Sequence, residues 1–478
     1  MEQLSGMDAS FLYFETPHAP MHIGSFMIYD PSTAPGGFVR FKDILANVES
    51  RLHLSRAFRQ KLMHVPLNLD HPYWVADTTF DLEFHVRHIA LPKPGDWRQL
   101  CIQAARLHAR ALDMSKPPWE MYVIEGLDNV EGAPPGSFAV LTKIHHAMID
   151  GVSGSEIQEF IHDIEAEPKV KPEVQPFEPE PEPNPLDLMA RANFNFATQP
   201  FRFMEVLARS MPGMANLSQG LGTSKLKMTA QAPRTRFNTT ITAHRVVDGK
   251  SFDLADIKLI RPVIQGSTVN DVVISVIGGA MHKYLSHYDE LPDRSLVAMA
   301  PISVRSETES GAAGNQVSAM AVELGSHIAD PIERLQYVYN STRNSKALTH
   351  AVGARNLADY SQFVPSALAG LASRLMTSPA MRSMTESAQP VFNTTITNVP
   401  GPQVPLYFTG AKAVSFVGLG VVTDGMGIFH PVFSYCGKIA ISVTACRELL
   451  PDPERYTACL QAAFDELLTA AQAATAGS

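Results

Sequence analysis

The sequence predicts a mixed α/β protein built from two halves, and three observations support this prediction. The chain has 478 residues, enough for two domains with substantial hydrophobic cores. Segments with strand periodicity alternate with segments of helix periodicity. Between them, Glu165 to Asp187 combines closely spaced prolines with glutamates, which disfavours helix and sheet and keeps the segment extended. We therefore expect domains at 1–164 and 236–478, joined by an acidic, proline-rich linker and an apolar helical connector at 165–235.

The first half contains both kinds of element. Apolar residues at helical spacing predict helices over 41–52 and 98–112. Alternating apolar and polar residues over 80–87 predict a half-exposed strand, and the apolar runs 121–124 and 138–144 predict further strands, the second of them buried. This half is therefore expected to pair a sheet with covering helices.

The second half continues the same mixture after the connector. Thr268 and Asp271 have the spacing of a capping box, and an apolar stripe follows them at helical intervals. This pattern predicts a buried helix that begins near residue 269. The remaining expected elements are strands at 296–300, 317–322, 392–397 and 431–444 and a helix at 332–343.

Two segments are unusually rich in apolar residues and are candidates for contact with a membrane. The segment 186–228 carries many Phe and Met residues and few acidic ones, which predicts irregular helix with an apolar face. Packing against the two domains explains it more simply than membrane contact does. The segment 364–384 is rich in Ala, Leu and Met and is a second candidate for a lipid-facing surface.

Composition excludes several classes of protein. A net charge of −9, without a basic stripe interleaved with aromatic residues, argues against binding to nucleic acid. The four cysteines lack metal-site spacing and fit a reducing compartment. The first residues lack the pattern of a secretory signal, and no apolar run approaches the roughly 20 residues of a membrane span. We expect a cytoplasmic protein, with peripheral attachment to a membrane left open.

The most informative segment is His145 to Gly151, with the sequence His-His-Ala-Met-Ile-Asp-Gly, directly after the predicted strand 138–144. A neutral imidazole, with an ordinary pKa of about 6.5, can take a proton from a hydroxyl group. Asp150 could orient the ring or anchor the loop, and Gly151 permits a turn that a side chain would obstruct. The turn after a strand would hold His145 or His146 rigidly, as a general base requires.

Two other interpretations of this segment have to be weighed. An adjacent histidine pair can be purely structural, with both rings hydrogen-bonded to backbone and Asp150 an ordinary turn residue. The histidines could also bind a metal ion, but the chain offers no evident further ligand cluster, so we expect no metal. The complete pattern after a strand favours catalysis.

Further motifs link the chain to a known family from end to end. They are, in order, Leu4-Ser5-Gly6-Met7-Asp8-Ala9-Ser10-Phe11, Pro20-Met21-His22-Ile23-Gly24, His145 to Gly151, Asn270-Asp271, Pro301-Ile302-Ser303-Val304-Arg305 and Asn398-Val399-Pro400-Gly401-Pro402. This set resembles the bacterial wax ester synthase/acyl-CoA:diacylglycerol acyltransferase family. The His motif alone also occurs in carnitine, chloramphenicol and plant alcohol acyltransferases and in condensation domains. The chain departs from the family at Pro117-Pro118-Trp119, where members usually have Pro-Leu-Trp, and we expect Trp119 to lie in the core.

The resemblance implies a fold and a reaction. The fold would be two chloramphenicol-acetyltransferase-like lobes, each a mixed sheet flanked by helices, with the active site in a tunnel between them. His146 would be the general base that deprotonates the acceptor hydroxyl as it attacks the acyl thioester. No covalent acyl-enzyme would form. Acyl-CoA would be a co-substrate, and no permanently bound cofactor is expected.

The resemblance also suggests roles for the other motif residues. His145 would shape the loop or line the tunnel, with a direct role equally open. Asp150 would pair with Arg305 of the other half and fix the loop. Asn270 is a candidate oxyanion donor, although a residue at a helix start is as often a cap.

The remaining motif residues have structural alternatives. Asp271 shares the motif of Asn270 and has capping-box spacing with Thr268. Asn398 begins a turn motif, for which plain turn chemistry is a strong alternative. The residues that bind coenzyme A are not predicted.

Three functional hypotheses follow. The leading one is an acyltransferase that esterifies long-chain alcohols or diacylglycerol from fatty acyl-CoA, as a monomer or homodimer. It would lie in the cytoplasm, with peripheral attachment to the inner face of the plasma membrane or to lipid bodies. A second is transfer from an acyl-carrier protein, as in condensation domains. A third is a lipid-binding protein that retains the fold without turnover.

One repeat has no explanation from the sequence. The hexapeptide Phe-Asn-Thr-Thr-Ile-Thr begins at both Phe237 and Phe392. It is too short to indicate duplicated domains.

Overall fold

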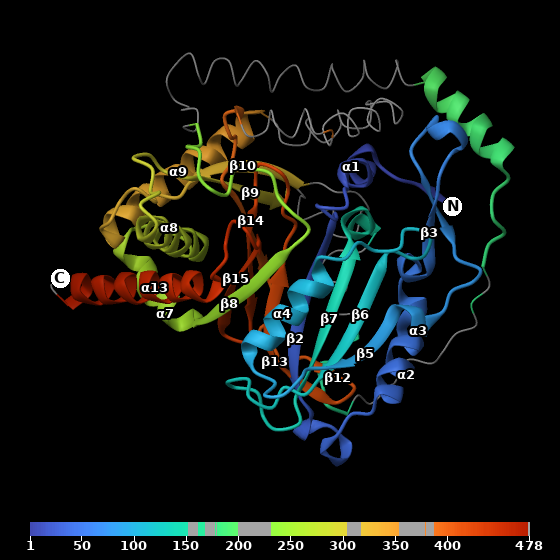
Figure 1. Cartoon of the computed structure of the whole chain (residues 1–478), viewed down its shortest axis with the longest axis horizontal. Helices are drawn as coiled ribbons and strands as arrows, with labels where there is room; N and C mark the ends of the chain where they lie inside the picture. Colours follow the sequence, from blue (N-terminus) through green and yellow to red (C-terminus); the bar gives the residue numbers. More distant parts are fainter. Residues whose placement is uncertain are drawn as a thin grey trace.

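The computed structural model describes residues 1–151, 161–167, 177, 179–198, 231–303, 317–352, 378 and 387–476. Two lobes lie side by side, each with a six-stranded mixed sheet, and the N-terminal lobe carries the blue and cyan elements in Figure 1. The predicted class of two sheet-containing lobes with flanking helices is confirmed. The structure describes only part of the predicted linker and connector, 165–235.

The first lobe is built on a sheet with the order β12-β13-β2-β7-β6-β5. Its strands are β2 (His22–Asp30), β5 (Val86–Ala90), β6 (Trp119–Glu125), β7 (Phe138–His145), β12 (Tyr407–Phe408) and β13 (Ala411–Leu419). Only β5 and β6 run parallel; the other neighbours are antiparallel. The strands predicted at 121–124 and 138–144 are the neighbouring strands β6 and β7, and both are buried nearly throughout, so both faces of this part of the sheet are covered.

Helices and a small second sheet surround this sheet. The helices are α1 (Gly6–Phe14), α2 (Phe41–Arg51), α3 (Leu82–His85) and α4 (Trp97–His108), and the small sheet is β1 (Glu2–Gln3), β4 (Tyr73–Ala76) and β3 (Gln60–Met63). Short 3₁₀ helices connect them: η1 (Pro31–Thr33), η2 (Pro35–Gly37), η3 (Leu52–Leu54), η4 (Arg56–Arg59), η5 (Pro66–Asn68) and η6 (His146–Gly151). The helices predicted over 41–52 and 98–112 are confirmed as α2 and α4.

The second lobe has the strand order β10-β9-β11-β14-β15-β8. These strands are β8 (Arg245–Asp253), β9 (Val297–Ser303), β10 (Val317–Glu323), β11 (Thr394–Pro400), β14 (Ile428–Tyr435) and β15 (Lys438–Cys446). Its helices are α7 (Leu254–Ile260), η7 (Arg261–Val263), α8 (Val269–His287), α9 (Pro331–Val352) and α13 (Pro453–Ala476). Together they form the largest core of the molecule.

Helix α8 explains how this core is organised. Thr268 caps it, because the backbone N–H of Asp271 donates to Thr268 Oγ1 at 3.3 Å and the N–H of Thr268 donates to Asp271 Oδ2 at 2.7 Å. The capping box predicted from the sequence is therefore confirmed. Most of the helix beyond the cap is buried, including Val273, Ile277 and Tyr284, and it packs between α9 and α13.

The second half of the chain supplies part of the first lobe's sheet. Strand β13 pairs with β2 from Lys412–Asp30 to Leu419–Gly24, although the sequence places it in the domain 236–478. A Cβ on Gly418 would lie 2.4 Å from the ring of Phe433 in β14, so the two sheets meet here at a distance that only glycine allows. The expected boundary at residue 236 therefore does not separate the two sheets.

The strand expected over 80–87 is wrong for its first six residues. Asp81 caps the short helix α3, since the N–H of Glu83 donates to its carboxylate at 3.0 Å. The ring of His85 is buried and stacks on Trp119 at 4.6 Å, with its Nδ1 2.8 Å from the Trp119 carbonyl oxygen. Strand β5 begins only at Val86. Packing against Trp119 therefore determines the conformation of this segment, although its alternating pattern had indicated an extended chain.

Some expectations lie wholly or largely outside the described residues. The connector 186–228 is described only to residue 198, where 185–198 is helical. Of the segment 364–384 only residue 378 is described. Among the described helices, none has the length and apolar character that a bilayer crossing requires.

The repeated hexapeptide now has a physical explanation. Asn238 and Asn393, the second residues of the two copies, are buried and joined by a hydrogen bond from Asn393 Nδ2 to Asn238 Oδ1 of 2.8 Å. Asn238 Nδ2 also donates to the Phe392 carbonyl at 2.8 Å, and the backbone N–H of Val297 donates to Asn393 Oδ1 at 2.9 Å. The two copies therefore fasten the segment before β8 to strands β9 and β11.

Candidate active site

The histidine pair sits where β7 ends and η6 begins. His145 is the last residue of β7 and His146 the first of η6. The backbone N–H of His145 donates to the Pro118 carbonyl at 2.9 Å, and that of His146 donates to the Met21 carbonyl at 2.8 Å. Neighbouring segments on both sides thus hold the backbone of the pair, which gives the two rings a fixed direction.

His145 is fully buried and makes hydrogen bonds through both ring nitrogens. Its Nε2 lies 3.1 Å from Glu15 Oε2, and the backbone N–H of Ala147 donates to its Nδ1 at 3.2 Å. Because Nδ1 accepts, the ring proton belongs on Nε2, where it is donated to Glu15. Such a ring has no lone pair left for a substrate. The contacts therefore fit the loop-shaping role suggested for His145.

His146 differs in each of these respects. Its ring stacks on Phe11, with centroids 3.9 Å apart and an interplanar angle of 12°. Its Nδ1 is enclosed and has no hydrogen-bond partner among the described residues, although the residue as a whole keeps partial solvent access. Burial, together with the neighbouring His145, lowers the pKa of His146 to about 4. At neutral pH the ring is therefore uncharged and able to accept a proton.

Helix α1 supplies two residues of the site that sequence reasoning missed. Ser5 caps the helix through the N–H of Asp8 at 3.1 Å, so α1 begins at Gly6 and ends at Phe14. Phe11 then faces His146, and Glu15 follows the last turn to reach His145. Phe11 lies in a motif already noted at the N-terminus. A carboxylate 130 positions before its histidine partner gives no local signal.

A second buried histidine pair lies next to the first. His22 in β2 is the cross-strand partner of His145, and its Nε2 donates to the His108 carbonyl at 2.7 Å. His108 Nε2 in turn donates to the Gly420 carbonyl at 2.9 Å. Burial lowers the pKa of His22 well below its ordinary value and that of His108 to about 3. These uncharged rings tie α4, β2 and the end of β13 together behind the site.

Arg245 connects the second lobe to the same region. It opens strand β8, is buried, and donates to the carbonyls of Thr242, at 2.5 Å, and His18. His18 lies between Glu15 and Met21, the two residues that contact the histidine pair. The segment that holds His145 and His146 is therefore itself held by the other lobe.

The structure describes the rest of the His motif only in part. Gly151 closes η6, as a turn residue would. The side chain of Asp150 and the whole of Arg305 lie outside the described residues, so the expected ion pair between them remains a prediction.

The Asn-Asp and Asn-Val-Pro-Gly-Pro motifs meet in the structure. Asn398 Nδ2 donates to Asn270 Oδ1 at 3.2 Å, which joins the end of β11 to the start of α8. Asp271 is buried, and besides the capping box it accepts from Thr342 Oγ1 at 2.6 Å. The carboxylate oxygens of Asp271 are thus engaged in hydrogen bonds at the start of α8. In the described part of the chain, no hydrogen bond links either asparagine to His146.

The Pro-Pro-Trp segment acts through its backbone and its core packing. The Pro118 carbonyl accepts from the His145 N–H, a contact that does not depend on the side chain at 118. Trp119 is buried, and its indole N–H donates to the Phe58 carbonyl at 2.9 Å. The expected core position of Trp119 is confirmed.

Comparison with known proteins identifies the relatives of this arrangement. Residues 4–273 match the model of the wax ester synthase/diacylglycerol acyltransferase catalytic domain, and residues 313–468 match the C-terminal domain of the same family. A Mycobacterium tuberculosis protein provisionally named diacylglycerol O-acyltransferase is 33% identical over 95% of this chain and 87% of its own. A second from that species, named a probable diacylglycerol O-acyltransferase, is 30% identical over 98% of this chain and 99% of its own.

Solved structures extend the comparison to the fold. The wax ester synthase/diacylglycerol acyltransferase of Marinobacter aquaeolei VT8 matches with a TM-score of 0.68 and 25% identity, over 99% of this chain and 100% of its own. The starter condensation domain of rhizomide synthetase, solved with C8-CoA, shares the fold at a TM-score of 0.51 and 12% identity, over 98% and 95%. The matches to both domains of this family identify the protein as an acyltransferase. The chain belongs to the wax ester synthase/diacylglycerol acyltransferase family.

Proposed function

We propose that the protein transfers a fatty acyl group from acyl-CoA to the hydroxyl of a long-chain alcohol or of diacylglycerol, with His146 as the general base. The observation that carries the proposal is the contrast within the pair. His145 uses both ring nitrogens in structural hydrogen bonds, whereas the uncharged ring of His146 is fixed by Phe11 and neither of its nitrogens has a hydrogen-bond partner among the described residues. Because Nδ1 is enclosed and the residue keeps partial solvent access, Nε2 is the nitrogen of His146 proposed to accept the proton.

The proposed reaction passes through one tetrahedral intermediate. The acceptor oxygen attacks the thioester carbonyl while its proton moves to the His146 imidazole. The intermediate then collapses, the carbon–sulfur bond breaks, and the imidazolium returns the proton to the departing coenzyme A thiolate. A base with a pKa of about 4 is weak, but it is fully available at neutral pH. The proton also becomes more acidic as the new carbon–oxygen bond forms, so its transfer becomes favourable during the attack.

Asn270 is the proposed donor to the oxyanion. Asn270 Oδ1 accepts the hydrogen bond from Asn398. The Nδ2 group of Asn270 is the donor end of the same amide and can therefore be directed at an oxyanion. Removing one oxyanion donor typically lowers kcat by about 10²–10³-fold. The Asp150–Arg305 pair remains the proposed anchor of the histidine loop.

The names of the relatives support the choice of substrates. Two mycobacterial relatives carry the name diacylglycerol O-acyltransferase, and the Marinobacter enzyme is named for both activities. Coenzyme A as the carrier agrees with the C8-CoA bound to the condensation domain of the same fold. An acyl-carrier protein is the alternative donor.

Product analysis would test this proposal directly. The enzyme would receive palmitoyl-CoA, with hexadecanol and dioleoylglycerol in competition, and palmitoyl-carrier protein would replace the CoA donor in a parallel reaction. We expect ester from the CoA donor and none from His146→Ala, which should fold like the wild type. Near-full activity of His146→Ala would overturn the assignment of the base. A null result across a broad panel of acceptors would favour a lipid-binding protein without turnover.

We also propose peripheral attachment to a membrane or lipid-body surface. The helix 185–198 packs Leu188 and Ala192 against the first lobe but exposes Leu186, Phe194 and Phe196 to 65–75%. Apolar side chains presented this way suit insertion into a lipid surface. Sedimentation with anionic liposomes would test the idea. A protein that stays in the supernatant, and whose Phe194→Ser/Phe196→Ser variant behaves identically, would contradict it.

A further inference from the structure

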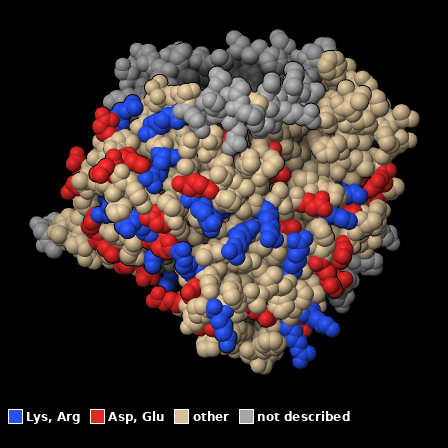
Figure 2. Space-filling view, viewed as in Figure 1, with Lys and Arg blue, Asp and Glu red and all other residues tan. Residues whose placement is uncertain are grey.

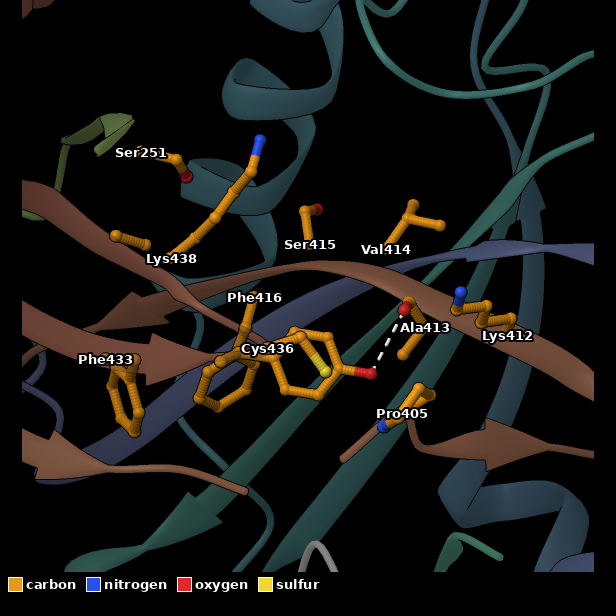
Figure 3. Close-up of a pocket in the computed structure, with 12 residues that line it drawn as sticks. Ser251, Pro405, Lys412, Ala413, Val414, Ser415, Phe416, Phe433, Cys436 and Lys438 are labelled. Atoms are coloured by element: carbon orange, nitrogen blue, oxygen red, sulfur yellow. Dashed lines mark hydrogen bonds between the residues drawn. The ribbon is translucent and has the colours of Figure 1, made fainter. Parts of the chain in front are cut away.

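A cleft separates the crossing strand β13 from the sheet of the second lobe. It has about 230 Å³ of free volume. One wall comes from β13, and the other comes from β14, β15 and Ser251 of β8 (Figure 3). Its floor is aromatic, because Phe416 and Phe433 meet edge to face at 4.4 Å. The Tyr435 hydroxyl donates to the Ala413 carbonyl at 3.1 Å and thereby fixes the two walls to each other.

The lining of this cleft carries one sign of charge. Lys412 and Lys438 are its only ionisable lysine, arginine, aspartate or glutamate residues, and neither forms an ion pair within the described part of the chain. The carboxylate of Asp30, opposite Lys412 across the strands, instead accepts from the Ser32 N–H at 2.8 Å. On the face shown in Figure 2, lysine and arginine side chains gather over α4 and β8.

These charges stand out in a protein whose net charge is −9. A polyanionic substrate is repelled by such a molecule as a whole and requires a local cationic region to bind. Two lysine ammonium groups, the hydroxyls of Ser251 and Ser415 and an aromatic floor are suited to a nucleotide. The ammonium and hydroxyl groups can bind phosphates, and the aromatic rings can contact a base or ribose.

The path from this cleft to His146 follows the strands. From Phe416, β13 runs to Leu419, which pairs with Gly24; two residues further along β2, His22 pairs with His145. These steps cover about 17 Å along the strands and about 10 Å across them. A ligand held here by its phosphates therefore needs a long arm to reach the histidine, and acyl-CoA has such an arm in its pantetheine.

We infer that the cleft between β13 and β14/β15 binds the phosphate-bearing nucleotide end of the acyl-CoA donor through Lys412 and Lys438. This inference rests on the proposed function for its substrate. It adds the location of the donor's head group and the two residues that recognise it.

Kinetics with two thioesters would test the inference. One donor is a short-chain acyl-CoA below its micellar concentration, and the other is the same acyl group on N-acetylcysteamine, which has no phosphate. We expect Lys412→Ala/Lys438→Ala to raise KM about tenfold for the CoA thioester, with kcat unchanged, and to leave the N-acetylcysteamine thioester unaffected. Lys438→Arg should keep most of the affinity, because the positive charge remains.

Lys250→Ala is the matched control. Lys250 is exposed on β8 beside Ser251, and strand alternation points it to the opposite face of the sheet. A double variant with an unchanged KM for acyl-CoA, or an equal loss with both thioesters, would overturn the inference. Calorimetric binding of free coenzyme A to the wild type and the double variant separates it from the proposed function. Equal binding by both proteins contradicts the cleft assignment, whereas weaker binding by the variant supports it even without turnover.

Discussion

Glu15 holds His145 and the residue that precedes β2 with a single carboxylate oxygen. Glu15 Oε2 lies 3.1 Å from His145 Nε2 and accepts the backbone N–H of Met21 at 2.8 Å. Met21 in turn accepts the N–H of His146 through its carbonyl. One carboxylate therefore fixes the ring of the first histidine and, through Met21, the backbone of the second.

Replacing Glu15 should impair turnover more than folding. Glu15→Ala removes both hydrogen bonds, so we expect kcat to fall by about 10²-fold as the loop loses its geometry. Glu15→Gln keeps one acceptor oxygen and should recover part of the loss. Steady-state kinetics at saturating donor and acceptor would measure the effect, with the exposed Glu83→Ala on α3 as control. Wild-type kcat in Glu15→Ala would refute the positioning role.

The loss of activity in acid should occur at unusually low pH. The base must be unprotonated, and its folded pKa is about 4, so kcat/KM should stay level as pH falls through 6.5 and decline only near pH 4. Phe11→Ala opens the ring to water and should move this midpoint upward, towards 6.5. A wild-type profile with an acid limb near 6.5 would mean that His146 is not held as described.

Stability should also fall in acid because several histidines are buried uncharged. The pKa values of His108, His146 and His430 are lowered to about 3, 4 and 3 by burial, and that of His22 is also well below 6.5. Below pH 6.5 the unfolded chain binds protons that the folded chain does not, so stability decreases as pH falls from 6.5 towards 4. Each histidine contributes up to about 1.4 kcal/mol per pH unit.

Urea denaturation at pH 7 and pH 5, followed by tryptophan fluorescence, would measure this loss of stability. His430→Gln, far along the chain from the histidine pair, should reduce the difference between the two pH values. Equal unfolding free energies at pH 7 and pH 5 would show that these rings are solvated.

The hydrogen-bonded pair Asn238 and Asn393 should contribute substantially to the stability of the second lobe. Asn393→Ala leaves Asn238 Oδ1 without one donor and the Val297 N–H without its acceptor, both in the interior. We expect the free energy of unfolding to fall by about 2–4 kcal/mol. Asn340→Ala, at an exposed position on α9, is the matched control and should change it by less than about 0.5 kcal/mol. Equal unfolding midpoints for the two variants would argue against the bridge.

Much of the fold could be predicted from the sequence where local patterns decide structure. The strand before His145 is a run of apolar residues, and the start of α8 follows from the spacing of Thr268 and Asp271. Both signals lie within a few residues, so neighbouring side chains suffice to specify the element. The position of the histidine pair at the end of a strand was therefore predictable.

The rest of the site depends on contacts that sequence spacing does not encode. Glu15 and Phe11 reach the histidine pair only because α1 packs beside η6, and Lys412 reaches the cleft only because β13 crosses between the sheets. The strand prediction for the segment before Val86 was wrong for a similar reason, because the conformation of that segment follows from the packing of His85 on Trp119. Such choices are made by tertiary structure.

The crossing of β13 also has a consequence for how the molecule is made. While the nascent chain leaves the ribosome, β2 and β7 emerge long before Ala411–Leu419, which form β13. Until β13 has been made, the backbone groups along one edge of β2 remain unpaired. An exposed edge of this kind can pair with another chain. The newly made first half is therefore expected to need shielding by a chaperone until its last strands arrive, and the two lobes reach their final form together.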